Sequence, residues 1–324
     1  MALFRRRRKH IAVIGGGTGS YTVLKGLKEY DLDLTAIVNV TDDGGSSGVL
    51  RDEFGVLPPG DLRRCIAALS NSSKVMKTLF QYRFPDGSVN NHSMGNLIIT
   101  ALQDITQSDT KAIEEASRIF SVKGRVLPVT LTRSRLHATL ENGETIHGES
   151  NIDVPKHDGN LRIREVYLKP IATAYPEAVE ALSRSDIIVI GPGDLYSSII
   201  PTLLVHGIPE AIRKSKARRV YVCNLMTKFG ETNDFQVHDF VDRINHHVPF
   251  SLDYIVYNDP LSFEKKVLES YASENAHPVG VSDHELRRFG VHTIQGNFAS
   301  PPPLARHDSG KLAKTIVDIL KWDY

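Results

Sequence analysis

The sequence predicts an α/β protein with a Rossmann-like, mostly parallel, doubly wound sheet that carries helices on both faces. Six short runs rich in Val and Ile recur along the chain, and segments with helical spacing separate most of them. The first two runs each end in a glycine-rich turn, which is typical of strands that lead into a phosphate site. The expected strands are residues 11–14, 34–40, 125–131, 186–190, 219–225 and 252–257.

Apolar residues at helical spacing predict the helices that cover this sheet. A last helix, ending at Leu320, is expected to begin after Asp308, because an Asp side chain can accept hydrogen bonds from the free N–H groups of a first helical turn. The other expected helical segments are residues 23–30, 97–105, 112–120, 178–182, 199–205, 235–244 and 263–271.

Two regions depart from this alternation. Residues 58–121 begin with a Pro-Pro-Gly-Asp signal for a helix start and are expected to be helical throughout. Residues 136–169 alternate apolar and polar side chains around an Asn-Gly pair, which predicts an antiparallel hairpin. We therefore expect a basic tail over residues 1–9 and a single domain over residues 10–324, with a helical insertion and a hairpin excursion.

Charge and composition exclude several classes of protein. The chain has 39 Lys and Arg against 38 Asp and Glu, a net charge of +1, which gives no reason to expect a nucleic-acid partner. A basic run at residues 5–9 is interpreted as a solvated tail, with an anionic lipid surface or an acidic partner as the alternative. No segment has the length of a secretory signal or a membrane span, so we expect no transmembrane segment and a cytoplasmic location. Cys65 and Cys223 lack metal-type spacing and predict reduced thiols.

The first glycine-rich turn, Gly15 to Ser20, follows the first strand and opens a helix. Backbone N–H groups at a helix N-terminus attract phosphate, so this turn predicts a nucleotide site, with a purely structural turn as the alternative. In NAD-binding sheets the second strand usually ends in a carboxylate that holds the ribose. Here that position is Asn39, whose amide can bond a ribose although the charge-specific NAD signature is missing. NAD therefore stays open as a ligand.

Two adjacent carboxylates, Asp42 and Asp43, follow the second strand. Beside a phosphate pocket they would repel the ligand unless a cation compensates, which predicts a magnesium ion that bridges carboxylate and phosphate. The alternative is a turn in which both carboxylates accept hydrogen bonds from the backbone N–H groups of residues 44–47.

Side chains of the expected helical region and its flanks supply further candidates. His92 and Asn96 are four residues apart and are expected to share one helical face, where His92 could act as an acid or base or bond a sugar. A helix cap or a packing role is the alternative for His92. Arg51, Arg63 and Arg64 can neutralise phosphate, and among them we favour Arg64.

A second glycine-bearing loop, Gly191 to Ser198, follows the fourth expected strand, and the next strand ends at Asn224. Glycines, hydroxyls and a helix start again gather where a strand ends. Four strand ends thus carry polar loops on what is expected to be one edge of the sheet. This clustering predicts a ligand site more strongly than any single motif.

These motifs together resemble the CofD-like superfamily and, within it, the YvcK-type gluconeogenesis factors. The resemblance covers nearly the whole sequence and rests on the segments Gly15 to Gly19, Asp42 to Gly48, Pro59 to Arg64, His92 to Asn96, Gly191 to Pro201 and Asn224 to Thr232. It implies a Rossmann-like bacterial cytoplasmic protein with roles in growth on gluconeogenic carbon sources and in cell shape. It also implies a UDP-sugar ligand such as UDP-N-acetylglucosamine.

Two branches of the superfamily imply different chemistry. The CofD branch transfers a phospholactyl group with magnesium held by an acidic loop, which Asp42 and Asp43 match in part. The glycine and serine run after them is the pattern of the regulator branch. Tyr271 and Arg306 fall where regulator-type relatives contact the UDP-sugar, with an ordinary helix Tyr and loop Arg as the alternative. Asp194 stands where a serine is expected in relatives.

The leading hypothesis from the sequence is a UDP-sugar-binding regulator, with a magnesium-dependent transferase as the rival and an NAD-binding protein as a third reading. A cell-wall or morphogenesis protein is the expected kind of partner, and a homo-oligomer is left open. If the protein is an enzyme, His92 and Asp42 are the catalytic candidates. The expected ligand-binding residues are Gly15, Gly16, Gly17, Thr18, Gly19, Asn39, Gly44, Gly45, Ser46, Ser47, Arg64, Asn96, Gly191, Gly193, Asn224, Tyr271 and Arg306.

Overall fold

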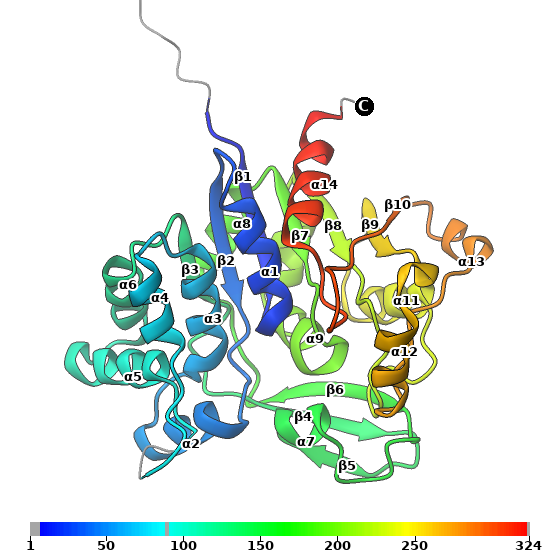
Figure 1. Cartoon of the computed structure of the whole chain (residues 1–324). Helices are drawn as coiled ribbons and strands as arrows, with labels where there is room; N and C mark the ends of the chain where they lie inside the picture. Colours follow the sequence, from blue (N-terminus) through cyan, green and yellow to red (C-terminus); the bar gives the residue numbers. More distant parts are fainter. Residues whose placement is uncertain (1–6, 88–90, 323–324) are drawn as a thin grey trace, which may run out of the picture.

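The computed structural model describes residues 7–87 and 91–322 and has a seven-stranded parallel sheet at its centre (Figure 1). The strand order β10-β9-β8-β7-β1-β2-β3 places β1 and β7 side by side, and the chain order reverses at this pair. The predicted Rossmann-like fold class is confirmed. The strands are β1 (His10–Gly15), β2 (Asp33–Val38), β3 (Arg125–Pro128), β7 (Ile187–Ile190), β8 (Arg218–Val222), β9 (Tyr254–Asn258) and β10 (His292–Gly296).

The apolar runs of the sequence form the buried strands of this sheet. Every residue of β1, β7 and β9 is buried, because strands of a parallel sheet are covered on both faces. The six expected strands are all present, with ends shifted by a few residues. The edge strand β10 was not expected, because its His-Thr-Ile-Gln-Gly sequence is mostly exposed and contains no apolar run.

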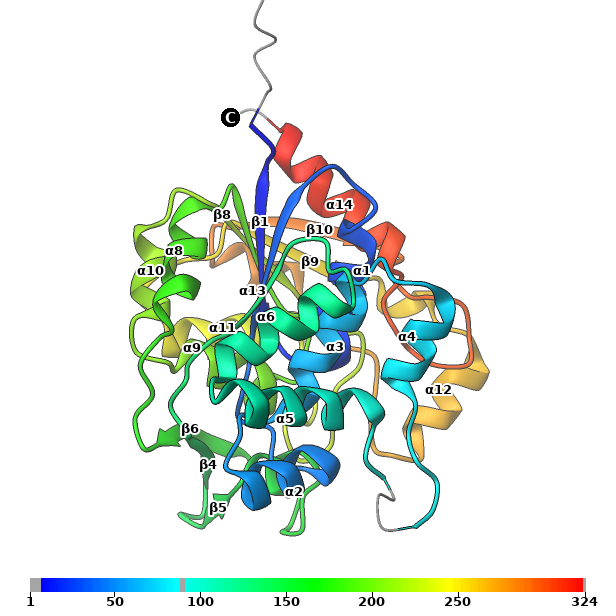
Figure 2. The ribbon, with the colours of Figure 1, turned by 90° about the vertical axis from the view of Figure 1, so that its left-hand side faces the viewer.

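Helices cover both faces of the sheet (Figure 2). Helices α1, α3 and α14 pack together on one face, and α8 and α10 pack on the other. The helices around the sheet are α1 (Gly17–Leu27), α2 (Gly45–Phe54), α3 (Pro59–Leu69), α4 (Lys74–Gln81), α5 (Met94–Thr106), α6 (Asp109–Ile119), α8 (Pro176–Arg184), η1 (Leu195–Ile199), α9 (Ile200–Leu203), α10 (Ile208–Lys214), α11 (Val237–His247), η2 (Pro260–Ser262), α12 (Lys265–Ala272), α13 (Asp283–Arg287) and α14 (Ser309–Lys321).

Helix α14 begins as predicted. The Asp308 side chain accepts hydrogen bonds from the backbone N–H groups of Gly310 and Lys311, both at 2.9 Å. This is the capping role that its position in the sequence indicated.

The helical region between β2 and β3 differs from the prediction in one respect. It contains α3 to α6, but the chain between α4 and α5 is not helical where the structure describes it. A Pro-Asp-Gly sequence at residues 85–87 explains the interruption, because these residues favour turns. His92 consequently lies before α5, whose N-cap is Ser93, and not on a helical face shared with Asn96.

The excursion at residues 136–169 is larger than a hairpin. It forms a three-stranded antiparallel sheet in the order β5-β4-β6, with α7 (Glu149–Asp153) between β5 and β6. The Asn-Gly pair makes the turn from β4 to β5, as expected. The strands are β4 (Arg135–Leu140), β5 (Thr145–His147) and β6 (Ile163–Lys169), seen below the main sheet in Figure 1.

The contact between α1 and α14 allows a test of whether close packing outweighs helix propensity at one glycine. Gly26 lies inside α1, where alanine would ordinarily stabilise a helix by about 1 kcal/mol. A Cβ at Gly26 would, however, lie 2.0 Å from the Ser309 carbonyl oxygen. We therefore expect Gly26→Ala to lower the free energy of unfolding by about 1 to 3 kcal/mol, measured by urea denaturation. Gly310→Ala, whose Cβ would approach only the flexible Asp308 side chain, is the control. A stabilised Gly26→Ala protein would contradict this account.

Candidate functional site

A cavity of about 700 Å³ opens at the carboxyl ends of β1, β2 and β7. This is the switch point of the sheet, where α/β proteins of this topology bind ligands. Loops after the three strands form part of the wall, and α3, α5 and α7 supply the rest. The sequence-predicted residues that line it are Gly16, Gly17, Thr18, Gly19, Asn39, Asp42, Gly44, Gly45, Ser46, Ser47, Arg64, Asn96 and Gly193.

The other predicted ligand residues lie elsewhere. Gly15 and Gly191 belong to strand ends and are absent from the cavity lining. Asn224, Tyr271 and Arg306 line a second cavity of about 270 Å³. This second cavity shares four residues with the main one, so the two lie next to each other. The shared residues are Thr18, Gly19, Gly193 and Asp194.

Glycine permits very close packing around the main cavity. A Cβ at Gly19 would lie 2.0 Å from the Pro192 carbonyl oxygen, and a Cβ at Gly16 would lie 2.1 Å from Asp61 Oδ2. Gly17 has φ +66°, a conformation that side chains rarely adopt. The first glycine loop therefore lies directly against the loop after β7 and against the start of α3.

Two helix N-termini open into this cavity without a side-chain cap. The N-cap residues of α1 and α2 are Gly16 and Gly44, and neither helix has a side-chain cap hydrogen bond. Free backbone N–H groups and the positive end of the helix dipole favour an anion at such positions. Asp61 already pairs with one of these N–H groups, because its carboxylate accepts a hydrogen bond from the Gly17 backbone.

A buried arginine forms the strongest cationic feature of the wall. Arg63 is 8% exposed, its Nε donates to Asn96 Oδ1 at 2.9 Å, and it has no ion pair with any described carboxylate. Burial, together with the neighbouring Arg64 and Arg83, lowers its pKa to about 10, while the charges of Asp61 and Asp42 oppose the shift. A buried charge without a counter-charge is costly, so Arg63 is set up to meet an anion.

Arg64, the arginine that the sequence favoured, is already partly neutralised. Its NH1 lies 3.1 Å from Asp61 Oδ1, and its side chain is 42% exposed. Both arginines line the cavity, but Arg63 has the greater need of an anionic partner. The sequence could not rank them, because the ranking depends on which way each side chain leaves α3.

Carboxylates also form part of the wall. Asp42, Asp61, Glu149 and Asp153 all line the cavity. Burial, reinforced by Asp42, raises the pKa of Asp61 to about 6, while Arg64 opposes the shift. Burial and the neighbouring carboxylates raise the pKa of Glu149 to about 9. The sequence predicted Asp61 only as part of a helix start and gave Glu149 and Asp153 no role in the site. The position of Asp61 beside Arg64 in one motif was the available signal.

The adjacent carboxylates Asp42 and Asp43 face different partners. Asp42 Oδ1 accepts a hydrogen bond from the Gly44 backbone at 3.0 Å, as the turn interpretation expected, and its side chain lines the cavity. Asp43 Oδ1 accepts from the Ser150 backbone at 2.8 Å, and Asp43 is not part of the lining. In this arrangement Asp42 and Asp61, rather than Asp42 and Asp43, are the carboxylates that could hold a magnesium ion against a bound phosphate.

His92 lies one layer behind the cavity wall. Its Nδ1 is 3.0 Å from Ser46 Oγ, and the same hydroxyl accepts from Asn96 Nδ2 at 3.0 Å. Ser46 and Asn96 line the cavity, whereas His92 does not. His92 thus orients Ser46, and Asn96 links Ser46 to Arg63.

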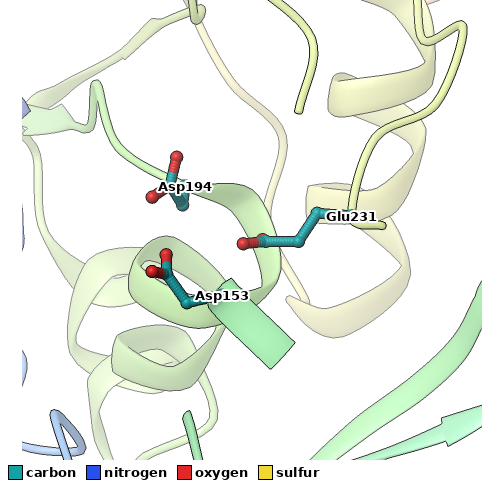
Figure 3. Close-up of side chains that lie close together, drawn as sticks. All are labelled: Asp153, Asp194 and Glu231. Atoms are coloured by element: carbon teal, nitrogen blue, oxygen red, sulfur yellow. The ribbon is translucent and has the colours of Figure 1, made fainter. Parts of the chain in front are cut away.

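One group of three carboxylates among the described residues has the spacing of a metal site. Oxygens of Asp153, Asp194 and Glu231 all lie within 4.8 Å of one another, and Figure 3 shows the three side chains close together. The ammonium group of Lys228 lies there, 2.9 Å from Asp194, 3.1 Å from Glu231 and in contact with Asp153. Burial alone would lower the pKa of Lys228, but the three carboxylates raise it above its ordinary value. A side-chain cation therefore fills this place.

Comparison with known proteins identifies the family. The family described as "2-phospho-L-lactate transferase CofD" matches residues 11–299. The protein named "Gluconeogenesis factor" of Halalkalibacterium halodurans is 41% identical over 96% of this chain and 97% of its own length. The protein of the same name from Bacillus subtilis is 40% identical over 97% of this chain and 99% of its own length.

The structural comparison agrees. A crystal structure of a UPF0052 family protein from Bacillus halodurans superposes with a TM-score of 0.91 at 40% identity, over 96% of this chain and 99% of that one. In the described part of the chain, none of the helices combines the length and apolar character needed to cross a membrane. The chain therefore belongs to the CofD family and, within it, to the gluconeogenesis factors.

Proposed function

We propose that this protein is a cytoplasmic regulator that binds a nucleoside diphosphate sugar, with UDP-N-acetylglucosamine as the expected ligand. The observation that carries the proposal is the meeting of two uncapped helix N-termini with the unpaired guanidinium of Arg63 in one cavity. A diphosphate group would satisfy all three. The names of the relatives support a role in growth on gluconeogenic carbon sources. A role in cell shape is part of the same proposal.

The neighbouring cavity suits the nucleoside half of such a ligand. Tyr271 presents a ring there, held by a hydrogen bond from the Ala305 backbone to its hydroxyl at 3.2 Å. Asn224 Oδ1 is buried without a hydrogen-bond partner among the described residues, which suits an N–H donor such as the imide of uracil. Arg306 lines the same cavity, and its side chain makes no hydrogen bond or ion pair within the described chain.

Regulation requires that the ligand favour one conformation of the protein over another. The helical region 58–121 lines the main cavity and the segment after Asn297 lines the second cavity. These are the parts that we expect to order around the ligand. Ordering of these two parts would change the surface of the protein around the cavities, and this surface would then contact a cell-wall or morphogenesis protein.

A magnesium-dependent transferase is the second candidate. The family description names a phospho-group transferase, and the carboxylates of Asp42, Asp61 and Glu149 line the phosphate-binding cavity. Magnesium held by Asp42 and Asp61 would neutralise a bound diphosphate and its leaving group. For NAD, the third candidate, the ribose position is Asn39, whose amide already donates to Thr41 and, at 3.3 Å, to the Ser197 carbonyl.

The first test is calorimetric titration with UDP-N-acetylglucosamine, with NAD and GDP as controls, in magnesium and in chelator. We expect saturable UDP-sugar binding that survives chelation and that Arg63→Met weakens by about tenfold or more, because a charge-assisted hydrogen bond is lost. Arg64→Met is the matched control and should lose less, since Asp61 already neutralises Arg64. If Arg63→Met binds the UDP-sugar as tightly as the unaltered protein does, Arg63 is not part of the site. If GDP is the only one of the three ligands that binds, and it binds only with magnesium present, the transferase is favoured.

The acidic wall makes binding depend on pH. The pKa values of Asp61 and Glu149 are raised to about 6 and about 9, so raising the pH from 6 to 9 adds negative charge beside the ligand. In chelator we expect affinity for the UDP-sugar to fall by about tenfold over this range. Glu149→Gln should reduce the fall in affinity over the upper part of this pH range. Glu165→Gln, which alters an exposed side chain on β6, should not. An unchanged slope in Glu149→Gln would show that Glu149 does not control the effect.

The transferase candidate has its own test. Asp42→Asn keeps an oxygen that can accept the Gly44 N–H bond but removes the charge that would hold magnesium. If the protein is a transferase, its magnesium-dependent turnover of a nucleotide-linked phospho substrate, followed by product chromatography, should drop at least a hundredfold in Asp42→Asn, an order-of-magnitude expectation for loss of a metal ligand. Asp43→Asn, which alters a carboxylate outside the cavity lining, should stay within a few fold. Absence of turnover with any donor and acceptor pair counts against this candidate.

A further inference from the structure

A third cavity, of about 500 Å³, lies between α1, α3, the end of α4 and the segment that leads into α14. It shares Thr18, Arg63 and Arg64 with the main cavity, and Thr18, Thr22, Arg306 and His307 with the second cavity. Tyr21 and Lys25 on α1 and Gln81 at the end of α4 line this cavity and neither of the other two described above.

The charged groups of this third cavity are nearly all basic. Lys25, Arg63, Arg64 and Arg306 line it, against a single carboxylate, Asp308. Lys25 and Arg306 are exposed and Arg63 is buried, so the cavity joins solvated cations to a buried one. Cations gathered in one hollow raise the local positive potential, which favours an anionic ligand.

The local partners do not remove this surplus. Asp308 Oδ1 already accepts hydrogen bonds from the Gly310 and Lys311 backbone as the cap of α14. Lys25 and Arg306 have no side-chain hydrogen bond or ion pair within the described chain, and Arg63 has only the neutral amide of Asn96. While the main cavity is empty, with Arg64 assigned to Asp61 and one cation to Asp308, about two positive charges remain unmatched, and a diphosphate that takes Arg63 would leave about one.

We propose that this third cavity is a second anion site, which takes a small phosphate monoester such as a sugar phosphate. A phosphate monoester carries a charge between about −1.5 and −2 at neutral pH, which matches the unmatched charge. The volume suits a small metabolite, and the Gln81 amide and the Tyr21 ring offer a sugar a hydrogen bond and a flat surface.

This inference rests on the proposed function in one respect only, because the two ligands would lie on either side of Arg63 and Arg64. Each anion would then sense the occupancy of the other cavity through shared cations, and any such coupling is reciprocal. A regulator with this arrangement would respond to a phosphorylated metabolite as well as to a nucleotide sugar.

The experiment is calorimetric titration with glucose 6-phosphate as the probe, repeated with the protein saturated in UDP-N-acetylglucosamine. We expect one molecule to bind in both cases, while glucose, which lacks the phosphate, gives no binding. Lys25→Met should weaken the sugar phosphate by about fivefold, in line with the loss of one partly exposed charge, and leave the UDP-sugar within about twofold. Lys314→Met, which removes the same charge from the outer part of α14, should change neither affinity by more than about twofold.

Each contrary result has a distinct meaning. An apparent glucose 6-phosphate affinity that keeps falling in proportion to the UDP-sugar concentration, without reaching a limit, would place the sugar phosphate in the main cavity and overturn the second site, because coupling between two separate sites reaches a limit at saturation. Equal effects of Lys25→Met and Lys314→Met, or no binding of the sugar phosphate, would overturn it as well. Sugar phosphate binding that Lys25→Met weakens, in a protein that binds no UDP-sugar, would uphold the second site and reject the proposed function.

Discussion

The site depends on the close packing of glycine backbones where β1 and β7 run side by side. Gly19 can lie against Pro192, and Gly16 against Asp61, only because neither glycine carries a Cβ. This contact keeps the first turn of α1 at the floor of the main cavity, where the Asp61 carboxylate accepts from the Gly17 backbone and the N-cap residue itself supplies no side-chain cap. The strand order creates the contact, since strands distant in sequence become neighbours at the switch point.

The second constraint is the division of charge inside the main cavity. Helix α3 contributes to both sides, because Asp61 lies in its first turn and Arg63 and Arg64 follow directly. Arg63 has no ion pair with a described carboxylate, whereas burial and neighbouring carboxylates together raise the pKa of Glu149. The arginines therefore stabilise a bound anionic ligand, and the carboxylates destabilise it. The balance is set by protons or a cation at the acidic wall, which is why the same geometry is compatible with a binding protein and with a metal-assisted transferase.

The sequence predicted those parts that depend on local pattern. Buried parallel strands need continuous apolar runs, and β1, β2 and β7 have them, whereas the exposed edge strand β10 does not. The glycine turns identified the cavity floor for a similarly local reason. Glu149 was not predicted as a site residue, because α7 reaches the cavity only through the packing of the antiparallel excursion and the sequence of α7 carries no motif.

The antiparallel excursion at residues 136–169 forms part of the cavity wall, and Lys228 links it to the loops of the main sheet through ion pairs. Lys228 follows β8 and contacts Asp153 on α7 and Asp194 after β7, so a single ammonium group joins three segments at the cavity rim. Asp194, which stands where relatives are expected to have a serine, thus serves as a partner of Lys228. The three carboxylates of this group exceed the one positive charge, and Asp153 contributes to the raised pKa of Glu149. A displacement of α7 would therefore carry Glu149 and Asp153 together and change the charge of the cavity, which couples the position of the excursion to the charge of the bound ligand.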